Sequence, residues 1–313
     1  MSSNSSATVS SYGAISSNRS GLVWGLVGVL AFSFTVPFTR VAVGGLSPLF
    51  IGSGRAVIAG LLAIAALALT RQYLPRGIQW ARLAVVAGGV VVGFPLLTSF
   101  ALTTAPASHG AVVIALLPAA TAVMAVIRAK ERPPVSFWVM AVIGALVAMV
   151  FASLQGGGFA QLTLSDLLLF GAVIAAAIGY AEGGLLAREL GSWQTVSWAL
   201  VLALPLMVVL TIVASVLQPQ AGTPVQWATF AYLAVVSMFL GFFAWYRGLA
   251  LGPMAQVSQV QLVQPVLSIL WAALLLHEEL TWSTILGGIA VLLCAGIAVR
   301  VRLNRPKPAA ART

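Results

Sequence analysis

A few polar side chains interrupt long apolar stretches, and three of them share one helix face. Gln261, Gln264 and Ser268 lie at positions i, i+3 and i+7, a spacing that places them on one side of a helix. Because an amide both donates and accepts hydrogen bonds, this stripe suits a polar neutral or zwitterionic ligand. The alternative is hydrogen bonding between neighbouring helices. Pro265 interrupts the stripe, and since broken helices line binding sites, we favour a cavity-lining role.

Three ionisable side chains also lie within apolar sequence, where a charge at the bilayer centre costs about 2.5–3.5 kcal/mol. Arg55 contacts an anion or carboxylate in the cavity, pairs with a helix carbonyl, or snorkels towards the outer face. Glu182, beside the further candidate contact Tyr180, binds an amine, carries a proton, acts in a gate or pairs with Arg188. His109 is more simply a hydrogen-bonded structural residue than a proton carrier, although histidine titrates near neutral pH.

Aromatic and hydroxyl side chains supply the remaining candidate substrate contacts. Trp245 and Tyr246 follow Gly241, which leaves space beside their rings. An aromatic face can stack on a planar side chain or hold an amine by cation–π attraction. Thr98 and Ser99 occupy the corresponding place in an earlier apolar stretch. We therefore expect all four side chains to contact a substrate.

The elements that must position these residues are membrane-spanning helices. The chain is 60% hydrophobic and 7% charged, whereas a soluble domain carries about 25% charged residues. A helix needs about 20 apolar residues to cross a bilayer, and the apolar runs are too long and too even for strands. The sequence thus predicts an all-α polytopic membrane protein. Its ten expected spans are 21–42, 47–70, 82–103, 107–127, 135–154, 163–187, 192–217, 225–249, 254–276 and 282–301.

A short pattern occurs twice in the chain and predicts two like halves. Pro106, Pro118 and Glu131 recur 147 positions later as Pro253, Pro265 and Glu278. We expect one five-helix repeat over 21–154 and a second over 163–301. Because five is odd, the second repeat enters the membrane inverted relative to the first. Pro118 and Pro265 each remove a backbone donor within a span, so we predict a hinge at both.

The positive charges predict how the spans are oriented. Lys and Arg collect in alternate loops and in the basic segment 302–313. Such residues stay cytoplasmic, so we expect both termini inside, with 1–20 as a flexible polar tail. The net charge of +10 is then a topology signal rather than a sign of nucleic-acid binding. We expect a multi-pass protein of the plasma membrane, the inner membrane of a bacterium.

The end of each half resembles a known family. The second copy runs from Gln264-Pro265-Val266 through His277-Glu278-Glu279-Leu280 to Gly287-Gly288. This pattern resembles the drug/metabolite transporter superfamily in its ten-helix EamA-type branch, and it is specific for fold but weak for substrate. The first copy departs from it with Arg132-Pro133-Pro134 and with Ala141 in place of Gly288. In overall character the chain is most similar to the aromatic amino-acid exporters of that branch.

The resemblance implies export of small amphipathic metabolites, most readily aromatic or other neutral amino acids, by alternating access through a central cavity. A proton-coupled exporter of cationic drugs is the alternative, but it requires a membrane carboxylate, and only Glu182 is a candidate. A membrane-embedded enzyme requires catalytic constellations that two His, one Cys and no Asp pair do not supply. A role as a receptor stays an alternative. We expect no catalytic residue, metal or cofactor. The expected partners are a small-molecule substrate and the lipid bilayer. The sequence predicts no oligomeric state.

Overall fold

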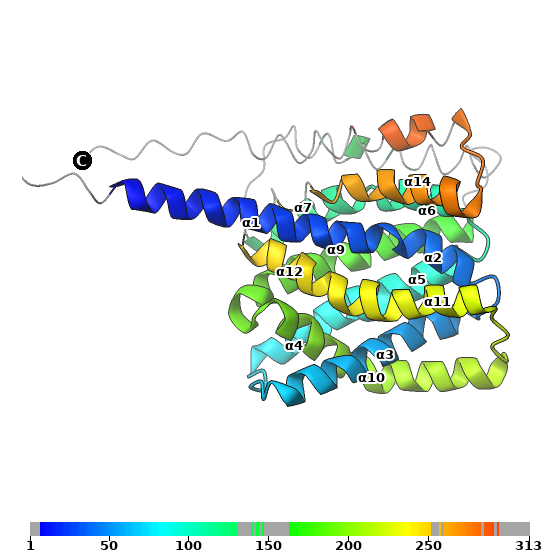
Figure 1. Ribbon diagram of the computed structural model, residues 1–313, viewed down its shortest axis with the longest axis horizontal. Helices are drawn as coiled ribbons and strands as arrows, with labels where there is room; N and C mark the ends of the chain where they lie inside the picture. The colour runs from blue at the N-terminus through cyan, green and yellow to red at the C-terminus, as the bar shows by residue number, and fades with distance from the viewer. Residues whose placement is uncertain are drawn as a thin grey trace, which may run out of the picture.

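The computed structural model describes residues 7–129, 139, 142–143, 146, 163–251, 257, 260–282, 285–290 and 293. Within these residues every regular element is helical (Figure 1). In chain order the elements are α1 (Ala7–Ser33), α2 (Thr35–Ala42), α3 (Pro48–Leu69), α4 (Ile78–Val86), η1 (Ala87–Gly93), α5 (Phe94–Ala101), α6 (Ala107–Ile114), α7 (Leu117–Ala129), α9 (Leu164–Leu190), α10 (Ser192–Leu217), α11 (Pro224–Tyr232), η2 (Leu233–Leu240), α12 (Gly241–Leu251) and α14 (Val263–Leu276).

The described helices confirm a polytopic membrane protein. Over the described part of the chain, seven helical stretches are long and apolar enough to cross a bilayer. Several of them consist of two or three consecutive elements, such as α4, η1 and α5. The helix α14 is shorter but also apolar. The bounds of these stretches and of α14 fall close to eight of the expected spans, because apolar length alone determines where a span can lie. The expected fifth and tenth spans, 135–154 and 282–301, lie largely outside the described residues. A total of ten spans therefore stays a prediction.

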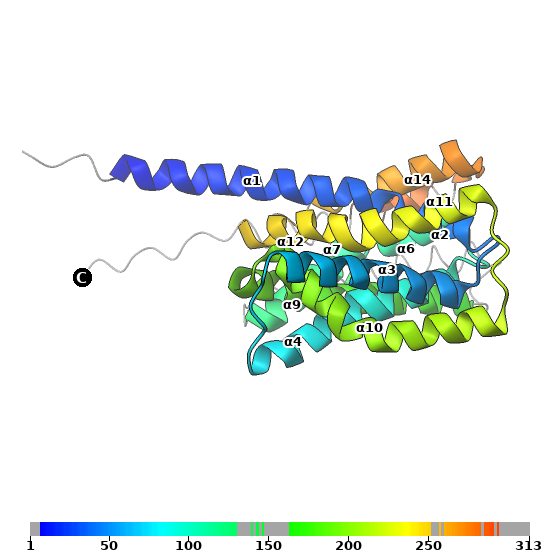
Figure 2. The ribbon, with the colours of Figure 1, turned by 60° about the horizontal axis from the view of Figure 1, so that its bottom comes forward.

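The N-terminal helix begins earlier than the sequence led us to expect. We predicted a flexible tail over 1–20, but α1 is already helical from Ala7 (Figure 2). The segment 7–20 contains no proline, and extending an existing helix costs much less than nucleating a new one. The apolar span that follows therefore supplies the nucleus. The expected basic tail 302–313 lies outside the described residues.

The helices run side by side along the bundle, and consecutive short elements such as α11, η2 and α12 together cross it from one end to the other (Figures 1 and 2). We call the end with loop 70–77 and the α9–α10 junction the basic end, and the end with loops 43–47, 102–106 and 218–223 the distal end. The pair α1–α2 runs from the basic end to the distal end, whereas α9 runs the opposite way. Likewise α3 runs towards the basic end and α10 towards the distal end, packed against each other.

Two spans contain a π-helical segment at matching positions. Shifted by the 147-residue spacing of the repeat, η1 (Ala87–Gly93) falls on 234–240, inside η2 (Leu233–Leu240). A π-helical turn is rare and frequently marks a functional site. At Gly89 a Cβ atom would overlap the carbonyl oxygen of Ala175 on α9. Glycine is therefore required where η1 meets that helix.

The two predicted hinge prolines follow breaks in their spans. Turns at 115–116 and 261–262 precede α7 and α14, so Pro118 is the second residue of α7 and Pro265 the third of α14. Proline is tolerated in the first turn of a helix because the N–H that it lacks has no intrahelical partner there. The prolines thus lie beside interruptions rather than inside continuous helices, and a hinge role for them stays a prediction.

Candidate functional site

A small cavity lies between helices from both halves of the chain. Each of the two π-helical segments contributes to its wall: Val90 comes from η1, and Ser237 and Met238 come from η2. The remaining lining side chains are Phe32, Thr35, Arg55, Phe94, Ala176, Tyr180, Phe242 and Gln264. Three of the predicted contacts, on α3, α9 and α14, therefore meet at one place.

Arg55 gives this cavity its charge. The residue is 1% exposed, and its Nε and Nη2 atoms have no hydrogen-bond partner among the described residues. It is held by α3, which begins at a cap where the Ser47 hydroxyl accepts a hydrogen bond from the Phe50 N–H at 3.2 Å. Arg55 is the only charged side chain among the described lining residues. A buried charge without a partner is costly, so the site favours a group that brings a negative charge.

Polar side chains accompany Arg55 on the cavity wall. The hydroxyls of Thr35 and Ser237 are 2.8 Å apart and satisfy each other. The Oε1 atom of Gln264 is buried and accepts no hydrogen bond from the described residues, so an acceptor and the guanidinium donors line the same space. The site therefore presents hydrogen-bonding groups of both kinds.

Aromatic rings form the apolar part of the wall. Phe32 and Phe242 have ring centroids 4.9 Å apart, and Tyr180 lies 6.0 Å from Phe242. Behind them Trp245 is fully buried and contacts the rings of Tyr180 and Phe32 at 5.6 and 6.4 Å. The hydroxyl of Tyr246 donates a hydrogen bond to the carbonyl oxygen of Gly179 at 3.2 Å. Trp245 and Tyr246 thus support the wall and are not among its described lining residues.

Four other predicted contacts are not among the described residues that line the cavity. Thr98 and Ser99 donate hydrogen bonds to carbonyl oxygens of their own helix at 2.6 and 2.7 Å, a bond that such hydroxyls often make within helices. Ser268 donates to the carbonyl oxygen of Ser33 at 2.7 Å. Gln261 is buried in the turn before α14, so the expected polar stripe is not a continuous helix face. Only Gln264 of that stripe lines the cavity.

Phe32, Thr35 and Ser237 line the cavity and were missing from the predicted site. Phe32 and Thr35 flank the short break between α1 and α2. Ser237 is a small polar residue within an apolar span. That polarity was a usable signal, whereas a phenylalanine that faces a cavity has the same sequence context as one that faces lipid.

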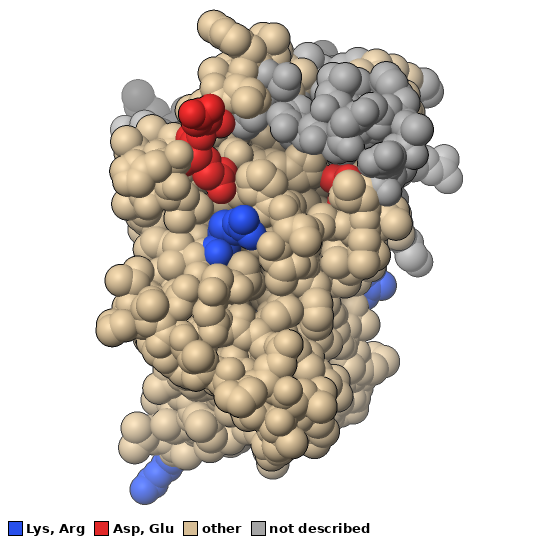
Figure 3. All heavy atoms as spheres, turned by 90° about the vertical axis from the view of Figure 1, so that its right-hand side faces the viewer, with Lys and Arg blue, Asp and Glu red and all other residues tan. Residues whose placement is uncertain are grey.

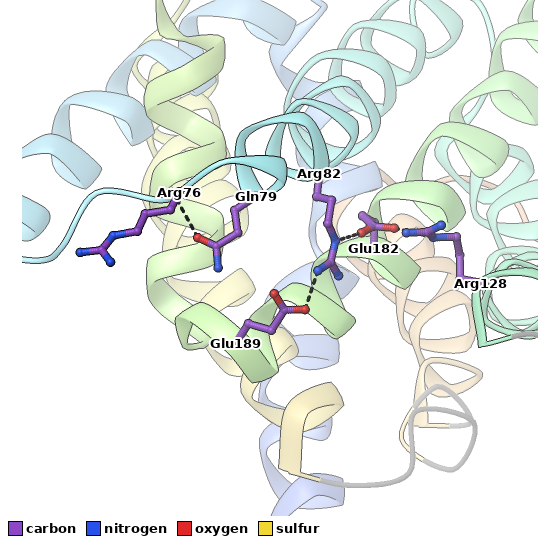
Figure 4. A network of polar contacts seen from close by, with 6 residues as sticks. All are labelled: Arg76, Gln79, Arg82, Arg128, Glu182 and Glu189. Atoms are coloured by element: carbon purple, nitrogen blue, oxygen red, sulfur yellow. Dashed lines mark hydrogen bonds and ion pairs between the residues drawn. The ribbon is translucent and has the colours of Figure 1, made fainter.

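An ion network closes the basic end of the bundle (Figure 4). Glu182 pairs with Arg82 of α4 and with the Nε atom of Arg128 of α7, the latter at 2.6 Å, and Arg82 also pairs with Glu189. We had considered Arg188 as the partner of Glu182, but in the structure Glu182 pairs with Arg82 and Arg128. Glu182 is 3% exposed, so this network joins α4, α7 and α9 through a buried carboxylate.

Polar contacts also join the helices at the distal end, whose surface carries few charged side chains (Figure 3). The Nε2 atom of His109 lies 2.7 Å from Oδ1 of Asp166, and Asp166 in turn caps α9 by accepting from Thr163. The carboxylate of Glu278 accepts hydrogen bonds from the N–H groups of Ala107 and Ser108 at 2.8 and 2.9 Å. His109 therefore sits in a structural contact between α6 and α9.

These features define a helical membrane protein with a polar cavity between its two halves, and comparison with known proteins gives its class. The model of the EamA-like transporter family matches the chain twice, over residues 19–153 and 163–300. The chain belongs to this family, a branch of the drug/metabolite transporter superfamily, and it transports a small molecule across a membrane.

Two similar proteins extend the comparison. The chain is 43% identical over 288 residues to the "Uncharacterized transporter YdeK" of Bacillus subtilis (strain 168), a match that covers 90% of this chain and 97% of that protein. A solved crystal structure matches with a TM-score of 0.66 at 19% identity, covering 92% of this chain and all of the other. At that identity the likeness shows the fold alone.

Proposed function

We propose that this protein exports small amphipathic metabolites, most readily aromatic or other neutral amino acids, through the central cavity. The observation that carries the proposal is the buried guanidinium of Arg55, which lines an aromatic-walled cavity without a partner among the described residues. A substrate carboxylate would supply a negative charge opposite the guanidinium, and its two oxygens would accept hydrogen bonds from the two N–H groups of the arginine fork.

The rest of the cavity suits the other parts of an amino acid. Gln264 offers a free acceptor, Oε1, to an ammonium group. The rings of Phe32, Tyr180 and Phe242 offer an apolar surface to the side chain. An aromatic substrate gains more from such a wall than an aliphatic one, because ring pairs contribute about 0.5–1.5 kcal/mol beyond their burial.

The cavity charge argues against the cationic-drug alternative. A cation in this space would face Arg55 with no carboxylate among the described lining residues. Glu182 is already shared between Arg82 and Arg128, so accepting a cation or a proton would break two ion pairs. A zwitterion avoids both penalties.

We further propose that transport is by alternating access between two inverted five-helix repeats. The opposite directions of α1–α2 and α9, and the matched π-helical segments, support this arrangement. From the positive-inside rule we propose that the basic end and both termini face the cytoplasm, and that the membrane is the plasma membrane. Glu182 and its arginines then form the cytoplasmic gate, with Pro118 and Pro265 beside the hinges.

Flux from proteoliposomes tests the proposed substrate. Vesicles with the purified protein are loaded with labelled phenylalanine, tryptophan, leucine or lysine, and efflux is followed with and without an imposed proton gradient. Protein-free vesicles are the control. We expect saturable efflux that is fastest for the aromatic amino acids and slowest for lysine. Preferred efflux of lysine or of a cationic dye such as ethidium, or no saturable flux of any amino acid, would overturn the proposal.

A further inference from the structure

A second hollow lies on the surface of the bundle at the basic end, away from the central cavity. It is bounded by α1, α12 and the junction of α9 with α10. We call it the basic groove, and its lining residues are Trp24, Val27, Ala187, Arg188, Gly191, Ser192, Trp193, Gln194, Leu240, Phe243, Ala244, Arg247, Ala250 and Leu251. It shares no lining residue with the central cavity.

Two exposed arginines give the basic groove a positive charge. Arg188 donates from Nη2 to the carbonyl oxygen of Leu249 at 3.4 Å, and this contact holds its side chain against α12. The guanidinium of Arg247 lies over the ring of Trp24 at 5.3 Å from the centroid. No acidic residue is among the described residues that line the groove. The groove is therefore complementary to an anion.

The start of α10 adds to this positive potential. Gly191, Ser192 and Trp193 line the groove, and the N-terminus of α10 has no side-chain cap. The first N–H groups of a helix lack intrahelical partners and carry the positive end of the helix dipole. Together with the two guanidinium groups they favour a ligand with several acceptor oxygens, such as a phosphate.

The remaining wall of the groove is apolar and faces outward. Val27 and Leu240 are 47% and 48% exposed, and Leu251 is 37% exposed. In a membrane protein such side chains contact acyl chains. Trp24 is 39% exposed beside Arg247, and an exposed tryptophan beside an arginine is typical of the depth of lipid headgroups. A soluble phosphate compound would leave this apolar wall without a partner.

We propose that the basic groove binds one anionic phospholipid, with its phosphate between Arg188 and Arg247 and its acyl chains along Val27, Leu240 and Leu251. Basic pockets between transmembrane helices are a recurring site for anionic headgroups. The lipid would bridge α1, α12 and the α9–α10 junction. This proposal concerns a surface site and does not depend on which substrate the central cavity carries.

Native mass spectrometry of the purified full chain tests the site by comparing retention of phosphatidylglycerol with that of phosphatidylcholine of the same acyl chains. We expect preferential retention of phosphatidylglycerol, and a loss of about 30-fold in its affinity in R188Q/R247Q, from roughly fivefold per arginine. The charge-conserving R188K/R247K should retain most of the preference. The matched control R71Q/R76Q removes two exposed arginines from loop 70–77 at the same end, and should bind as the parent does.

Three results would overturn the proposal. They are equal retention of the two lipids by the parent, an equal loss in R71Q/R76Q, and full displacement of phosphatidylglycerol by glycerol 3-phosphate at the same concentration. The last result would indicate a site for a soluble anion. Melting temperatures measured without added lipid show whether each variant is folded. If R188Q/R247Q does not fold, the comparison of R188K/R247K with R71Q/R76Q still tests the site.

Discussion

Arg55→Met is expected to raise the stability of the ligand-free protein while it removes transport. Methionine has a similar length and is apolar, so it keeps most of the packing of α3 and removes a charge that is 1% exposed. The Nε and Nη2 atoms that it removes have no partner among the described residues. The substitution therefore breaks no described hydrogen bond.

The magnitude follows from the cost of the buried charge. A charged arginine at the centre of a membrane helix costs about 2.5–3.5 kcal/mol on insertion scales. Part of this cost is offset by the polar side chains that line the cavity with Arg55, so we expect a net gain of about 1–3 kcal/mol in the free energy of unfolding. Functional sites often contain groups that lower the stability of the ligand-free protein.

Arg40→Met is the matched control. Arg40 lies near the end of an apolar span, and its Nη1 atom donates to the carbonyl oxygens of Leu102 and Thr103, both at 2.8 Å. These carbonyls follow α5 and lose their partner in the variant. Removing hydrogen bonds from a charged donor costs about 1.5–3 kcal/mol. The same chemical change should thus destabilise the protein at Arg40 and stabilise it at Arg55.

Thermal unfolding in detergent micelles measures both variants, and the proteoliposome assay measures flux. We expect Arg55→Met to melt at a higher temperature than the parent and to export no aromatic amino acid. Arg40→Met should melt at a lower temperature. If Arg55→Met melts at a lower temperature and still transports, Arg55 is a structural residue and the substrate contact assigned to it is wrong.

Three further predictions concern contacts outside the cavity. Glu182→Gln leaves two arginines without their shared carboxylate, so it should lower the unfolding free energy by about 1–3 kcal/mol. It should also speed maleimide labelling of a cysteine placed at Ser237. Unchanged labelling would contradict the gate role of Glu182. Glu278→Gln weakens the cap on α6 and should cost about 1 kcal/mol, whereas Glu279→Gln should cost less, and equal melting temperatures of the two variants would refute this. Tyr246→Phe loses one buried hydrogen bond and should cost about 1 kcal/mol with normal flux; lost flux would show that the hydroxyl contacts the substrate.

The sequence was sufficient for the features that depend on composition and on short-range pattern. Apolar length located the described spans. The family was recognised correctly from the second repeat copy. Arg55 and Gln264 were identifiable because a polar group inside a span is expensive and needs a reason.

The sequence was not sufficient for features that depend on how helices pack. Arg82 lies 100 positions from Glu182, and no local pattern connects them. Phe32 and Phe242 line the cavity, yet phenylalanine also faces lipid in such helices, so only packing separates the two environments. The π-helical segments lie in sequence as apolar as the flanking turns, because a π turn follows from local packing rather than from a residue signature.

The contacts at the two ends of the bundle differ in strength, and under alternating access that difference sets which end opens more easily. Opening the basic end separates α9 from α4 and α7, which breaks both ion pairs of a carboxylate that is 3% exposed. Opening the distal end between α14 and α6 releases Glu278 from two backbone N–H groups. A helix cap is worth about 1 kcal/mol, whereas a hydrogen bond to a charged group is worth about 1.5–3 kcal/mol, and Glu182 makes two of these to arginines. We therefore expect the ligand-free protein to open first at the distal end, so that a reagent added on that side labels a cysteine at Ser237 faster than one added on the basic side.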